Sequence, residues 1–73
     1  MHAAVASSDE TTVVLLATGE ALEVTGRLDE VAKRLENATR SSAGTLAWFD
    51  EAQANQRLGV NPAHVVSIRP GRD

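Results

Sequence analysis

The sequence predicts an α+β fold in which one helix packs on one face of a four- to five-stranded antiparallel sheet, in the order β-β-α-β-β-β. Three observations predict it. Two apolar, β-branched runs flank a turn at Gly19, the next stretch repeats its apolar residues at helical spacing, and three short apolar runs follow. With 73 residues and no cysteine, the chain has room for one small domain and no disulfide framework.

The domain organisation follows from composition along the chain. We expect a flexible leader over residues 1–11, a single αβ domain over residues 12–70 and a tail over residues 71–73. The leader lacks the positive and apolar regions of an export signal, and the longest apolar run, residues 13–17, is too short to cross a bilayer. We therefore expect a cytoplasmic protein without a membrane partner.

The first two strands form a hairpin. Residues 12–17 are β-branched and apolar on both faces, and Thr18-Gly19 supplies a residue able to adopt positive φ. Residues 21–25 resume the extended pattern, with Leu22 and Val24 on one face. A turn of two to four residues then joins the strands.

A helix follows the hairpin. Thr25 or Gly26 can act as its N-cap, and Asp29 and Glu30 lie in the first turn, where the helix dipole favours anions. Its apolar face consists of Leu28, Val31, Ala32, Leu35 and Ala38. Residues 41–44, Ser-Ser-Ala-Gly, end it.

The second half of the chain is predicted to be extended. Residues 45–49 form a short strand, and the polar residues 50–56 form a loop between paired strands. Residues 58–60 return as a strand, residues 61–63 make an Asn-Pro-Ala turn, and residues 65–68 form the last strand.

Trp48 and Phe49 are the only aromatic residues, and neighbours on a strand point to opposite faces. Leu46 and Trp48 form the larger alternating pair, so we expect Trp48 to cover the helix and Phe49 to point outward. The face away from the helix would then be apolar and open to a partner. Its predicted interface residues are Val14, Leu16, Phe49 and Val65.

No combination of residues indicates chemistry. His64 has no acid within eight positions, which favours a turn residue over a catalytic base. The three Asp-Glu pairs are explained by a helix start and by solvated segments, because two adjacent carboxylates on a surface share one environment and cannot divide the roles of acid and base. The glycines are scattered and form no phosphate loop. We expect no catalytic residue, no cofactor and no metal ion.

The function that the sequence favours is a non-catalytic protein–protein interaction or self-assembly module, with a second copy or another protein as its partner. Ten acidic residues against seven basic ones give a net charge of −3, and no basic stripe favours nucleic acid. The alternative is a small nucleic-acid-binding or regulatory domain. Its contacts would be Arg57, His64, Arg69 and Arg72 at one end of the sheet.

Two segments resemble small uncharacterised bacterial and phage αβ proteins. These segments are the hairpin LATGEALEV with the helix start LDEVAKRL, and the closing strand VNPAHVVSI. Small flagellar proteins of the FlbD type share both pieces in the opposite order along the chain, so the resemblance implies no flagellar role. It implies a compact αβ domain with no family active site. Asn61 is expected to bond the backbone two residues on, and Pro62 to fix the turn.

Overall fold

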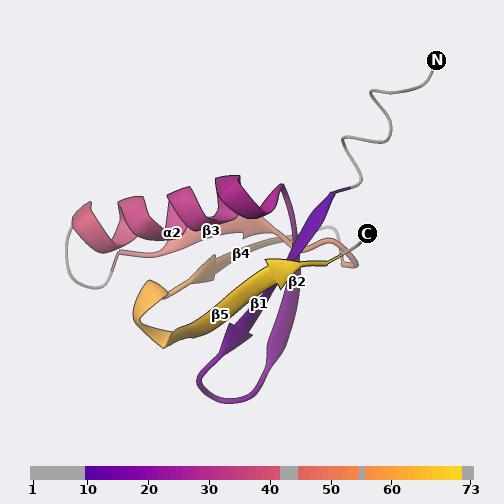
Figure 1. Cartoon of the computed structure of the whole chain (residues 1–73), viewed down its shortest axis with the longest axis horizontal. Coiled ribbons are helices and arrows are strands. Elements are labelled where there is room, and N and C mark those ends of the chain that lie inside the picture. Colours follow the sequence, from indigo (N-terminus) through magenta and orange to yellow (C-terminus); the bar gives the residue numbers. More distant parts are fainter. Residues whose placement is uncertain (1–9, 42–44, 55, 72–73) are drawn as a thin grey trace.

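The computed structural model describes residues 10–41, 45–54 and 56–71. It confirms the predicted α+β class and the order β-β-α-β-β-β (Figure 1). The elements are β1 (Thr11–Leu16), β2 (Ala21–Thr25), α2 (Leu28–Ser41), β3 (Ala47–Asp50), β4 (Arg57–Val60), the 3₁₀ turn η1 (Pro62–His64) and β5 (Val65–Pro70). Most of the predicted leader, and Arg72 in the tail, lie outside the described residues.

The first sheet is antiparallel in the order β2-β1-β5. Val14 is the centre of its inner face, because it pairs with Leu22 on one side and with Ile68 on the other. The β1–β2 turn closes through a hydrogen bond from the Leu16 amide to the Glu20 carbonyl, 2.9 Å. Gly19 in this turn has φ of 96°, a conformation that favours glycine over every other residue.

The second sheet is the hairpin β3–β4. The five strands are antiparallel as predicted, but they divide between two sheets. A single bridge between Val24 and Glu51 joins β2 to the end of β3, supported by the Ala52 amide, which donates to the Glu23 carbonyl at 2.9 Å. The strands therefore follow the spatial order β4-β3-β2-β1-β5. Among the described residues, β4 and β5 are the two outermost strands, with one neighbour each.

Helix α2 lies beside the β3–β4 hairpin (Figure 1). It buries Val31, Leu35 and Ala38, and it carries the predicted acidic first turn. Leu28 and Ala32, which the sequence placed on the same apolar face, remain exposed. The buried face of α2 is therefore narrower than the predicted apolar face, because it consists of three side chains instead of five.

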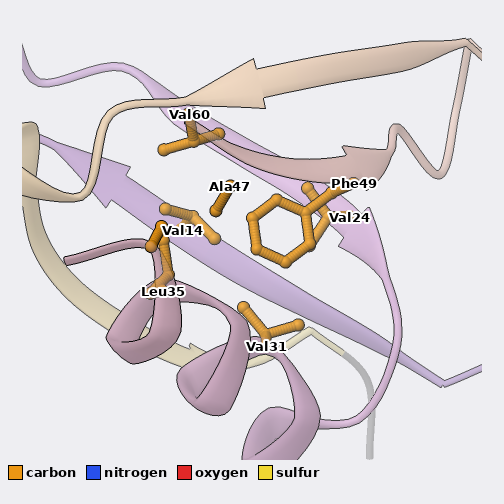
Figure 2. Packing of buried hydrophobic residues seen from close by; sticks show 8 residues of the cluster. Val14, Val24, Val31, Leu35, Ala47, Phe49 and Val60 are labelled. Atoms are coloured by element: carbon orange, nitrogen blue, oxygen red, sulfur yellow. The ribbon is translucent and has the colours of Figure 1, made fainter. Parts of the chain in front are cut away.

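The core forms where the two sheets and α2 meet. Figure 2 shows the Phe49 ring among side chains from both sheets and the helix, with Val24 and Val31 close to it. The cluster of buried hydrophobic residues comprises Val14, Val24, Val31, Leu35, Ala38, Ala47, Phe49 and Val60. Thr12 is also fully buried, and its hydroxyl donates to the Gly26 carbonyl at 3.0 Å, which satisfies the polar group.

The predicted orientation of the two aromatic residues is wrong. Phe49 is 2% exposed and Trp48 is 49% exposed. The alternation along the strand was correct, but the face that meets the helix carries Ala47 and Phe49. The alternation of side chains along a strand shows which residues share a face, but it does not show which face is buried. The buried face depends on how the strand pairs with its neighbours.

The turn before β5 forms as expected. The Asn61 side-chain oxygen accepts a hydrogen bond from the Ala63 amide at 3.0 Å, and Pro62 begins η1. The His64 carbonyl then accepts from the Ala17 amide at 2.7 Å, which ties the turn to the end of β1. Within the part of the chain that the structure describes, no helix has the length and hydrophobicity needed to cross a membrane.

Candidate interaction surface

The four residues predicted to form an interface do not lie on an outward face. Val14 is fully buried and Phe49 is part of the same core, so the outward placement of both is wrong. Leu16 and Val65 pair with each other across the β1–β5 ladder and are half-buried against that core. The face of β1 that carries Val14 and Leu16 meets the same core as the face of β3 that carries Phe49, so none of these side chains is left for an outward face.

The four predicted nucleic-acid contacts are not brought together. Arg57 begins β4, whereas His64 ends η1 at the other end of that strand. Arg69 lies opposite Val13 on the three-stranded sheet, five residues along β5 from His64 and thus about 16 Å away at the rise of a strand. Arg72 lies outside the described residues. The three described residues therefore give no continuous basic track.

The exposed tryptophan has a defined position on the outer face of β3–β4. Trp48 pairs with Gly59, and the hairpin closes through a hydrogen bond from the Glu51 amide to the Gln56 carbonyl at 2.7 Å. Glu51 and Gln56 thus form a hydrogen-bonded pair, and such pairs alternate along the ladder with non-hydrogen-bonded pairs, whose Cα atoms lie closer together. Trp48 and Gly59, three positions along the ladder, therefore form a non-hydrogen-bonded pair. A Cβ at Gly59 would lie 3.2 Å from Trp48 Cη2, so the indole lies directly over the glycine.

A second contact orients the indole from β4. The Arg57 guanidinium carbon lies 5.4 Å from the centre of the Trp48 ring, within the range of a cation–π interaction. Arg57 and Gly59 are two positions apart on one strand and so share its outer face. The indole therefore contacts both the backbone of β4 and the Arg57 guanidinium, and half of Trp48 remains exposed.

Arg34 connects the helix to the same place. One of its guanidinium nitrogens donates to the Trp48 carbonyl at 2.9 Å, and the guanidinium carbon lies 5.8 Å from the centre of the Phe49 ring. The Trp48 carbonyl points away from β4, so Arg34 gives this acceptor a partner that β4 does not supply. Arg34 therefore fixes α2 against the strand that carries both aromatic residues.

Arg34, Trp48 and Arg57 border a shallow depression of about 350 Å³ between the second half of α2 and β3. Its lining includes two arginines and no carboxylate, in a chain that is acidic overall. We call Arg34, Leu46, Trp48 and Arg57 the Trp48 surface. Leu46 is also exposed, and a Cβ at Gly59 would lie 2.8 Å from its Cδ1, so it lies beside the indole.

Sequence reasoning missed Arg34 as part of this surface. Arg34 is not among the residues of the predicted apolar face, and nothing in the local sequence pairs it with a strand residue 14 positions later. Gly59 did carry a signal. A glycine inside an otherwise apolar strand often marks a close approach of another group, which here is the indole.

The described residues include no group of three or more histidine or acidic side chains that could hold a metal ion. Comparison of the chain with known protein families, with characterised proteins and with solved structures finds no significant match.

Proposed function

We propose that this chain is a non-catalytic protein-interaction module and that the Trp48 surface is its contact site. The observation that carries the proposal is the half-exposed Trp48, held over Gly59 by Arg57. Tryptophan and arginine are enriched among the residues that dominate binding energy at protein interfaces. Here Trp48 and Arg57 lie together on the outer face of the β3–β4 hairpin.

Pre-organisation supports this proposal further. A free surface tryptophan loses side-chain freedom when a partner covers it, and that loss opposes binding. Trp48 already has its ring position restricted by Gly59 and Arg57, and its backbone is held by Arg34. A partner that covers the exposed half of the indole therefore gains apolar burial at a reduced entropic cost.

The test is affinity capture with matched variants, quantified by mass spectrometry from cells that produce the protein. Trp48→Ala removes the indole, whereas Val66→Ala shortens a side chain that is 63% exposed on β5. We expect at least one protein to be captured by the wild type and by Val66→Ala and to be lost with Trp48→Ala. Equal capture of the same proteins by all three chains would contradict the proposal.

Self-assembly is a second candidate, and the open edges of β4 and β5 favour it. Each of these strands has one neighbour, and unpaired strand edges readily add a further strand from another chain. Val66, at the irregularity of the β1–β5 ladder, is the most exposed large hydrophobic residue on β5. Sedimentation equilibrium at micromolar concentration is the test. Self-assembly predicts oligomers that Val66→Lys weakens, and a monomer at all concentrations contradicts it.

A further inference from the structure

We infer that the Trp48 surface binds a short acidic segment of a partner protein, an inference that rests on the proposed function. An apolar side chain of that segment packs on the exposed half of Trp48. Its carboxylates pair with two guanidinium groups that line the depression, that of Arg57 over the indole and that of Arg34 at the Trp48 carbonyl.

Charge is the first support for this partner. The depression is lined by two arginines and by no acid, although acidic residues outnumber basic ones in the chain. The ion pairs among the described residues involve Arg27 and Arg40, which lie elsewhere on the surface. A negatively charged segment therefore finds complementary charge here, and such complementarity selects partners and speeds their association.

The geometry of Arg57 is the second support. Asp50 lies directly across the β3–β4 ladder from it, yet the guanidinium lies over the Trp48 ring and forms no ion pair with Asp50. A guanidinium keeps its N–H groups in its own plane even when it lies over a ring, and these groups match a carboxylate with two parallel hydrogen bonds. Arg57 therefore presents a pre-oriented donor beside an apolar ring.

A protein segment fits this surface better than a nucleic acid does. Single-stranded nucleic acids bind grooves in which basic groups follow several phosphates and in which several rings stack with bases. The Trp48 surface offers one ring and two arginines. Two positive charges match a segment with a few carboxylates.

Trp48 is the only tryptophan, so its fluorescence reports on this surface directly. The probe is the capped peptide Glu-Asp-Leu-Asp-Glu, and its control is Gln-Asn-Leu-Asn-Gln, which has the same shape without charge. We expect the acidic peptide to shift the emission saturably and to bind at least about tenfold more tightly than the control. Raising the salt to about 0.5 M should remove most of that difference.

Two variants that each remove one positive charge show whether the acidic peptide binds at the Trp48 surface. Arg57→Gln removes a guanidinium from the Trp48 surface, and Arg69→Gln removes one from the exposed face of the other sheet. We expect Arg57→Gln to weaken the acidic peptide about tenfold and Arg69→Gln to leave its affinity within about twofold. Circular dichroism of both variants checks that the fold is kept.

Three results would overturn the inference. They are no saturable binding of the acidic peptide up to about 5 mM, equal affinity for the uncharged control, and equal weakening by both arginine variants. Tighter binding of oligothymidine than of the acidic peptide, lost in Arg57→Gln, would assign the surface to nucleic acid instead. If the acidic peptide does not bind while Trp48→Ala still loses a captured protein, the inference about an acidic segment is wrong and the proposed interaction module is retained.

Discussion

The indole of Trp48 lies over the backbone of Gly59, its partner in the β3–β4 ladder, so closely that a Cβ on the glycine would be 3.2 Å from Cη2 of the ring. The same Cβ would be 2.8 Å from Leu46 Cδ1. The absence of a side chain at one strand position therefore allows the largest side chain of the neighbouring strand to lie flat on the outer face.

Gly59→Ala should displace the indole while the protein still folds. The closest atom, Leu46 Cδ1, is the end of a flexible and exposed side chain, so the contact is relieved by movement at little cost in stability. We expect a clear change in Trp48 emission and quenching by acrylamide, with an unfolding midpoint close to that of the wild type.

Gly19→Ala is the matched control for this prediction. Gly19 has φ of 96° and no atom within 4 Å of an added Cβ, so alanine there suffers backbone strain without a clash. We expect a loss of about 1 kcal/mol and an unchanged emission spectrum. The prediction fails if Gly59→Ala leaves the emission unchanged as well.

Thr12→Val should destabilise the fold although the two side chains have nearly the same shape. The Thr12 hydroxyl is fully buried and donates to the Gly26 carbonyl at 3.0 Å, so valine leaves that acceptor without its donor. We expect a loss of about 1–2 kcal/mol in urea unfolding. Thr25→Val, at an exposed position of β2, should change stability by less than about 0.5 kcal/mol. Equal effects of the two substitutions would contradict a role for the buried hydrogen bond.

Much of this fold was predictable because its determinants are local. The glycine turn of the first hairpin, the acidic start of the helix and the Asn61 turn each depend on residues a few positions apart, and the structure has all of them. The cap of α2 is a small exception. The helix begins at Leu28, and the carbonyl of Arg27 accepts its first bond, rather than that of Thr25 or Gly26.

The buried face of β3 was not predictable from local pattern. Trp48 and Phe49 alternate whichever face is buried, and side-chain size favoured the larger pair as the inner one. The structure reverses this because Phe49 fits between β2 and α2, near Val24 and Val31 (Figure 2). The indole of Trp48 lies over Gly59 on the outer face instead. Which face of β3 is buried depends on how it pairs with strands that lie elsewhere in the sequence, so the residues of β3 and its neighbours in the chain do not reveal it.

Arg34→Met should weaken the attachment of α2 to β3. Methionine keeps most of the aliphatic length, so the change removes the hydrogen bond to the Trp48 carbonyl and the cation over the Phe49 ring. Because the site is exposed, we expect a loss of about 1 kcal/mol in urea unfolding. Lys33→Met, one position earlier on the exposed side of the helix, should have little effect. A loss of equal size in both variants would indicate a general effect of charge instead.

Phe49 belongs to the core, whereas Trp48 lies on the outer face of β3, and unfolding curves of two alanine variants, followed by circular dichroism, distinguish these two positions. Phe49→Ala should lose about 3–5 kcal/mol, which removes most of the stability of so small a domain. Trp48→Ala should unfold cooperatively with a midpoint close to that of the wild type. A folded Phe49→Ala together with an unfolded Trp48→Ala would show that Trp48, and not Phe49, is the core residue.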